Sequence, residues 1–153
     1  MTPSPATASS RLWLVRHAAP LVPPGTCYGA WDVPADAQAT RAAAERLATA
    51  LPPGGRAVCV AYSTLQRCEL LAHELQALRP DLTFTPDARL REVDFGRWEG
   101  QTWDAIGKSA IDTWVAGFAT HAPGGGESLA HMLHRVAAAL QTAQAWRTEL
   151  DVK

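Results

Sequence analysis

Residues 12–17 read Leu-Trp-Leu-Val-Arg-His, four apolar side chains followed at once by a cation and a titratable nucleophile. Four consecutive apolar residues predict a strand that is buried on both faces, as a central parallel strand is. A loop rich in proline and glycine follows the histidine. Open α/β sheets bind ligands beyond the carboxyl ends of their strands, so Arg16 and His17 fall where such a fold keeps its chemistry. Taken alone, Arg16 and His17 are more simply interpreted as a charged pair that caps a strand. The rest of the chain favours the interpretation as a functional site instead.

The composition is that of one globular domain without a bias toward charged partners. Of the 153 residues, 47% are hydrophobic and 19% are charged, and the formal net charge is -1. These values give no support for nucleic acid or a membrane surface as a partner, and no apolar run is long enough to predict a membrane span. Residues 1–10 lack the basic and apolar regions of a signal peptide and are predicted to be a disordered tail before a domain over residues 11–153. Three cysteines without a C-x-x-C pair indicate reduced thiols and a cytoplasmic location.

Strands and helices alternate along the chain, which favours a parallel sheet with helices on its faces. Further strands are predicted over residues 57–62 and 82–85. Apolar residues at helical spacing predict helices over residues 36–51, 63–79, 102–118 (as one or two short helices) and 129–150. The second of these begins with Ser63-Thr64-Leu65-Gln66, which fits a capping box with Ser63 as the N-cap.

Arg67 lies in the first turn of this second helix, off its apolar stripe. A cation there opposes the helix dipole, so the position is a poor choice for stability alone. An anion held by both the arginine and the helix N-terminus would compensate. A solvated surface arginine is an equally good interpretation when Arg67 is considered by itself.

Residues 90–100, with two glycines, two aromatic residues and three carboxylates, are predicted to form an irregular loop, the kind of segment that presents functional groups. Glu92, Asp94 and Glu99 are the carboxylates of this loop. Any of the three is a candidate general acid, and any could instead pair with a neighbouring arginine.

Four segments occur in the order and spacing of the histidine phosphatase superfamily, the phosphoglycerate-mutase-like group, and the chain resembles that family over nearly its whole length. These segments are Leu14-Val15-Arg16-His17, residues 62–67 (YSTLQR), residues 90–100 (LREVDFGRWEG) and residues 123–128 (PGGGES). A fifth segment, residues 25–29 (GTCYG) with residues 32–34 (DVP), is similar to the α-ribazole phosphatase branch, which removes phosphate from α-ribazole 5′-phosphate during cobalamin assembly.

The resemblance implies a three-layer α/β/α sandwich with a mainly parallel central sheet, and a phosphomonoesterase that needs no metal or other cofactor. Arg16 and Arg67 can present planar guanidinium groups to the phosphate oxygens. Neutral His17 attacks phosphorus to form a phosphohistidine, and a hydrogen bond to its other ring nitrogen must fix the tautomer. Glu92 matches the family's acid and protonates the leaving alkoxide. Tyr28 lies in the loop expected to line the pocket above the phosphate.

The chain departs from the family at its end. Family members carry a second catalytic histidine on a further central strand after the last helix, whereas this sequence stops at Lys153. We therefore expect a domain truncated at its C-terminus that lacks the C-terminal strand or strands and is weakly active or inactive. An open sheet edge also predicts self-association.

Two classes of function remain open from the sequence, a phosphatase acting on a small phosphate ester and a catalytically impaired domain that only binds phospholigands. The aromatic residues Trp31, Trp103 and Trp114 could stack on the substrate or belong to the core. His131 and His134 have a spacing that could suit zinc, but without an evident third ligand they are better interpreted as surface histidines.

Overall fold

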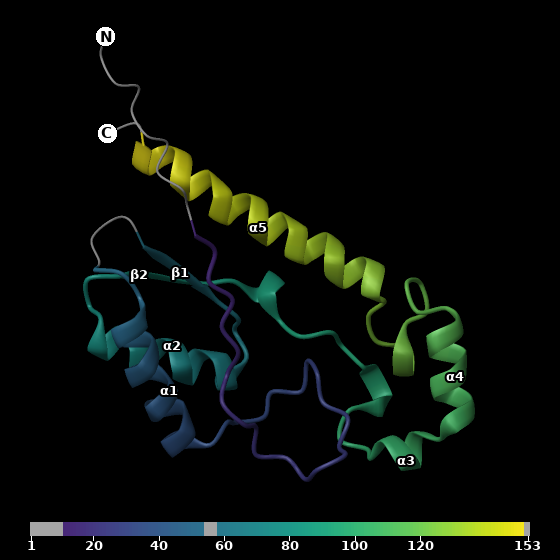
Figure 1. Ribbon diagram of the computed structural model, residues 1–153. Coiled ribbons are helices and arrows are strands. Elements are labelled where there is room, and N and C mark those ends of the chain that lie inside the picture. Colours follow the sequence, from purple (N-terminus) through teal and green to yellow (C-terminus); the bar gives the residue numbers. More distant parts are fainter. Residues whose placement is uncertain (1–10, 54–57, 152–153) are drawn as a thin grey trace.

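The computed structural model describes residues 11–53 and 58–151 of the chain (Figure 1). The predicted tail over residues 1–10 lies outside these ranges. Short 3₁₀ helices are labelled η below. The elements follow in the order α1 (Ala37–Ala50), β1 (Cys59–Tyr62), α2 (Gln66–Leu78), β2 (Thr83–Pro86), η1 (Ala88–Leu90), η2 (Gly96–Trp98), α3 (Trp103–Ile106), α4 (Lys108–Ala116), η3 (Pro123–Gly125) and α5 (Leu129–Asp151).

The strands β1 and β2 pair in parallel, with Cys59 opposite Thr83 and Tyr62 opposite Pro86. Helix α2 is the crossover between them, as a parallel connection requires. Helices α1 and α2 lie on one side of this short sheet and α5 lies on the other (Figure 1). The predicted α/β class with a parallel sheet between helices is therefore confirmed.

The core lies where α1 and α2 pack against each other and against the sheet. Its buried members come from both helices and from the entrance to β2, and half-buried residues of α1 and both strands pack around them. The buried members are Ala44, Leu51, Leu71, Leu75 and Leu82. Helix α1 begins as the sequence predicts, because the carboxylate of Asp36 accepts the amide of Ala39 at 2.7 Å.

The predicted buried strand over residues 12–15 is wrong for this structure. The segment forms no strand, and its side chains are 67%, 44%, 88% and 51% exposed from Leu12 to Val15. Continuous apolar sequence predicts burial, but a strand also needs a neighbouring backbone to pair with. Within the described residues, backbone pairing of this region begins only at Ala19, whose carbonyl accepts the amide of Asp36 at 2.9 Å.

The capping box at Ser63 is also wrong. Helix α2 begins at Gln66, and its cap residue, Leu65, contributes no side-chain hydrogen bond. The amide of Gln66 donates instead to the carboxylate of Asp32 at 2.7 Å. A distant loop therefore supplies the cap that the local pattern assigned to Ser63.

Candidate active site

His17 is half-buried at the end of the extended N-terminal segment. Its Nδ1 atom lies 2.7 Å from the carbonyl oxygen of Ala18. A carbonyl can only accept a hydrogen bond, so Nδ1 carries the proton in the neutral ring. The lone pair is then on Nε2, the nitrogen left available for attack on an electrophile.

The surroundings of His17 keep the imidazole neutral at pH 7. Burial lowers the pKa of His17 below its usual 6.5, and the charges of Arg67 and Arg16 lower it further. The hydrogen bond to Ala18 and the charge of Glu92 act in the opposite direction but do not reverse the shift. The structure therefore brings Arg16, Arg67 and Glu92 within electrostatic range of one imidazole, although they come from three separate segments.

Arg67 is buried, with 1% of its surface exposed, so the interpretation as a solvated surface arginine is excluded. Two of its nitrogens donate to backbone carbonyls, Nη1 to Trp31 at 2.9 Å and Nη2 to Gly29 at 2.6 Å. Its guanidinium also lies 5.4 Å from the centre of the Tyr28 ring. The third nitrogen, Nε, is buried and has no hydrogen-bond partner. A buried donor left unpaired is costly, and an oxygen atom of a bound anion would satisfy it.

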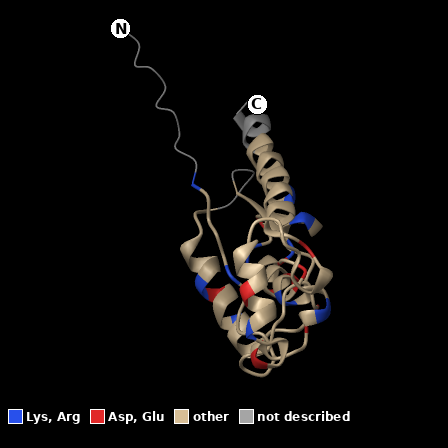
Figure 2. Ribbon diagram, turned by 90° about the vertical axis from the view of Figure 1, so that its right-hand side faces the viewer, with Lys and Arg blue, Asp and Glu red and all other residues tan. Residues whose placement is uncertain are grey.

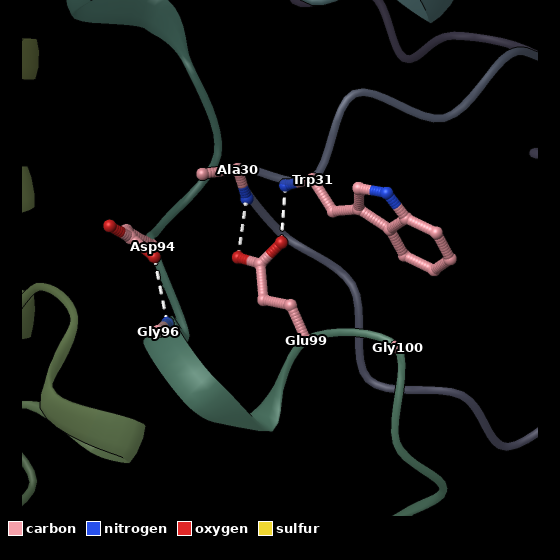
Figure 3. A pocket seen from close by; sticks show the side chains of 6 residues that line it. All are labelled: Ala30, Trp31, Asp94, Gly96, Glu99 and Gly100. Carbon is pink, nitrogen blue, oxygen red and sulfur yellow. Dashed lines mark hydrogen bonds between the residues drawn. The ribbon is translucent and has the colours of Figure 1, made fainter.

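Glu92 lies between η1 and η2 with its side chain exposed, and its carboxylate accepts the amide of Val93 at 3.1 Å. The other two carboxylates of the same loop also accept hydrogen bonds from backbone amides (Figure 3). Glu99 accepts the amides of Ala30 at 2.8 Å, of Phe95 at 3.0 Å and of Trp31.

Asp94 accepts the amide of Gly96 at 2.7 Å. Glu99 and Asp94 both line an open hollow of about 360 Å³, together with Ala30 and Trp31 (Figure 3). Glu99, with three amide partners, has a structural task. Asp94 and Glu92 each accept one amide, and of these two carboxylates Glu92 is the one whose charge acts on His17.

Two residues that the sequence analysis did not place at the site also belong to this region. The carboxylate of Asp32 accepts the amide of Gln66, which is the first residue of α2 and directly precedes Arg67. Cys68 is half-buried beside Arg67; burial raises the pKa of its thiol, and the charges of Arg67, Glu92 and Asp32 all act on it. No sequence signal marks Cys68 as part of a site, whereas Asp32 belongs to the segment Asp32-Val33-Pro34 that resembles the α-ribazole phosphatase branch.

The aromatic residues of the C-terminal half pack against one another. The Phe95 ring meets those of Trp103 and Trp114 edge-on, each at a centroid distance of 5.7 Å, and Trp114 also contacts Trp98 and Phe118. This packing favours a structural role for Trp103 and Trp114. Trp31 differs, because it is 46% exposed at the rim of the hollow.

Charges of both signs are interspersed over the helices and loops (Figure 2). No group of three or more His, Cys, Asp or Glu side chains that could hold a metal ion occurs within residues 11–53 and 58–151. Over the same residues, no helix is long and apolar enough to cross a membrane.

A neutral imidazole with a free Nε2, two guanidinium groups and a nearby carboxylate suit the binding of a tetrahedral oxyanion and nucleophilic attack upon it. The chain belongs to the histidine phosphatase superfamily (branch 1), whose family model matches residues 12–152. The superfamily inferred from the sequence motifs is thereby confirmed. No curated protein sequence matches the chain.

Solved structures agree with this assignment. The chain is similar to a mycobacterial glucosyl-3-phosphoglycerate phosphatase, with a TM-score of 0.68 and 29% identity over 84% of this chain and 61% of that one. The same phosphatase has been solved with inorganic phosphate, and that structure matches with a TM-score of 0.67 and 28% identity over 84% of this chain and 60% of that one. The protein TTHB049 from Thermus thermophilus matches with a TM-score of 0.63 and 30% identity over 83% of this chain and 69% of that one. The chain thus spans about three-fifths of the length of the mycobacterial phosphatase.

Proposed function

We propose that the chain is a phosphomonoesterase that acts through a phosphohistidine on His17 and needs no metal ion. The observation that supports this most is the buried, unpartnered Nε of Arg67, an arginine whose charge acts on an imidazole that holds its proton on Nδ1. An unpaired cationic donor and an available nucleophilic nitrogen are the two groups that a phosphate ester requires at its oxygens and its phosphorus.

In the first step, the lone pair of His17 Nε2 attacks phosphorus while the bond from phosphorus to the ester oxygen breaks. The departing alkoxide takes the proton of the Glu92 carboxyl group and leaves as an alcohol. In the second step, water gives a proton to the Glu92 carboxylate and attacks phosphorus, and the bond from nitrogen to phosphorus breaks. Inorganic phosphate and neutral His17 are regenerated. Arg16 and Arg67 hold the phosphate oxygens throughout.

We propose that the ester is α-ribazole 5′-phosphate, which would place the chain in cobalamin biosynthesis. The support is the 25–29 loop with its Asp32-Val33-Pro34 extension, in which Tyr28 contacts Arg67 and would face the group esterified to the phosphate. The mycobacterial relative is named for a different ester, a glucosyl phosphoglycerate. A panel containing both esters and simple alkyl phosphates separates a dedicated α-ribazole phosphatase from a broad-specificity one.

The test of the mechanism is Glu92→Gln. We expect slower release of phosphate from esters, with phosphate binding retained because both arginines remain. Acid-labile labelling of the protein by a phosphate ester should be lost in His17→Ala and retained in Glu92→Gln. Unchanged turnover in Glu92→Gln would move the acid role to another carboxylate. Phosphate binding without any turnover by the unaltered chain would assign it to the catalytically impaired class, which the expected lack of a C-terminal strand and second histidine also predicts.

We also propose that copies of the chain associate through residues 12–15 and the open edge of β1. The four apolar side chains there are exposed, and β1 pairs with β2 along one edge only within the described residues. Leu14→Lys should shift the chain toward monomer in sedimentation velocity; an unchanged distribution of sizes would exclude this surface. The free state of all three cysteines supports a reducing, cytoplasmic setting.

A further inference from the structure

The loop that carries Glu92 is held from outside by one arginine of α5. Arg135 Nη1 donates to the carbonyl oxygens of Arg89 and Arg91, each at 2.7 Å, and Nη2 donates to that of Glu92 at 3.2 Å. These three acceptors are the backbone immediately before and at Glu92. The path of the chain into Glu92 is therefore set by a side chain more than 40 residues away.

Arg135 is itself fixed in place by Glu127. The two side chains form a pair of hydrogen bonds, Nε to Oε1 and Nη2 to Oε2, both at 2.7 Å. They are only 22% and 16% exposed, and the hydrogen bond from Arg135 lowers the pKa of Glu127. A two-point ion pair of this kind fixes the plane of the guanidinium group as well as its position.

The chain leaving Glu92 is fastened by the same unit. The amide of Glu127 donates to the carbonyl of Asp94 at 2.7 Å. Gly126 lies so close to this carbonyl that a Cβ atom there would come within 2.2 Å of it, and a Cβ on Gly124 would come within 2.1 Å of the Phe95 carbonyl. The segment from η3 into α5 therefore holds the loop on both sides of Glu92, while the Glu92 side chain itself stays exposed.

We infer that Arg135, held by Glu127, is a positioning residue that sets where the Glu92 carboxyl group meets the leaving-group oxygen. The inference rests on the proposed function of Glu92 as the acid. Arg135 touches neither substrate nor phosphate in this scheme and acts only through the backbone of residues 89–92.

The decisive measurement is the dependence of kcat/KM on the leaving group in Arg135→Met and Arg135→Lys. An alkyl phosphate needs a proton as its alkoxide departs, whereas an activated nitrophenyl phosphate departs without help. Misplacing the acid should therefore lower kcat/KM for the alkyl ester by about 10- to 100-fold and leave the nitrophenyl ester little changed. Lysine should behave as methionine does, because an ammonium group cannot span three carbonyls and a bidentate carboxylate. Arg46→Met, which removes an exposed arginine from α1, is the matched control.

A merely structural role predicts a different pattern, since a smaller folded fraction lowers both esters equally. Equal losses on both esters, or no loss on either, would overturn the inference. Glu92→Gln separates this outcome from failure of the mechanism itself. If Glu92→Gln shows no preference between leaving groups, Glu92 is not the acid; if it shows one and Arg135→Met does not, only the positioning role fails.

A second readout does not need turnover. The charge of Glu92 raises the pKa of His17, so an NMR titration of the His17 ring reports where Glu92 lies. Removing the positive charge of Arg135 would by itself raise the pKa of His17, whereas release of Glu92 would lower it. We expect Arg135→Met to lower it in the unaltered background and not in the Glu92→Gln background. A rise or no change in the unaltered background would contradict the inference.

Discussion

Substituting Glu99 by glutamine distinguishes the structural carboxylate of the loop from the catalytic one. The Glu99 carboxylate accepts the amides of Ala30, Trp31 and Phe95. Glutamine keeps the shape but replaces one acceptor oxygen with an NH₂ group, which then faces an amide donor. At least one hydrogen bond is lost outright, and the others weaken because they are no longer assisted by charge.

The expected loss of stability follows from these contacts. A hydrogen bond to a charged group contributes about 1.5–3 kcal/mol, and a neutral one contributes about half as much. Losing one bond and halving two others would cost about 3–6 kcal/mol. Partial exposure of Glu99 lets water replace some of this, so we expect about 2–4 kcal/mol of lost free energy of unfolding.

Urea unfolding measures this loss as a lower midpoint with an unchanged slope. Glu45→Gln removes the same charge from an exposed site on α1 and should stay within about 0.5 kcal/mol of the unaltered chain. Glu92→Gln should likewise remain stable and yet turn over esters slowly. A Glu99→Gln protein as stable as Glu45→Gln but without turnover would refute this assignment of roles.

Three further predictions concern pH and the helix ends. Because burial and the charges of Arg67 and Arg16 lower the pKa of His17 below 6.5, protonation of His17 should reduce kcat/KM only below pH 6.5. Arg16→Met should move this acid limb to higher pH, and a limb above pH 6.5 in the unaltered chain would contradict the electrostatics. Arg135 lowers the pKa of Glu127 below its usual 4.5. This ion pair should therefore stabilise the fold fully above pH 4.5 and progressively less as the pH falls through the pKa that Glu127 has in the folded protein. In Glu127→Gln, the free energy of unfolding, measured by urea titrations at several pH values, should depend less on pH in this acid range. Arg79 donates hydrogen bonds to the carbonyl oxygens of Ala48 at 3.1 Å and Pro52 at 2.8 Å, at the end of α1. Arg79→Met should therefore lower the midpoint of urea unfolding. An unchanged midpoint would mean that water binds these carbonyls equally well.

The elements that the sequence predicts correctly are those with local causes. Helix α1 has an N-cap aspartate and alanine-rich helical spacing, and α5 has a long apolar stripe; both appear within a residue or two of the predicted bounds. The sequence predicts one or two short helices over residues 102–118, and the structure has two for local reasons, because Thr102 caps α3 and Gly107 separates α3 from α4.

The failures arise where distant backbone decides the outcome. The apolar run at residues 12–15 carries no information about whether a pairing partner is present, and the capping box at Ser63 competes with a carboxylate 34 residues before Gln66. At the site, the sequence indicates that the charge of Arg67 is unfavourable in the first turn of its helix, because it opposes the helix dipole. It could not show that the side chain is buried and holds two carbonyls of the 29–31 loop, because those carbonyls belong to no motif.

The loop of residues 29–31 is held by groups that do not belong to it. Its amides bind Glu99 and its carbonyls bind Arg67, so its course does not depend on the side chains at positions 30 and 31. Gly29 is fixed, since a Cβ atom there would come within 2.0 Å of the Val93 carbonyl. Substitutions at Ala30 and Trp31 would therefore leave the course of this loop unchanged, and with it the two carbonyls that hold the Arg67 guanidinium in place.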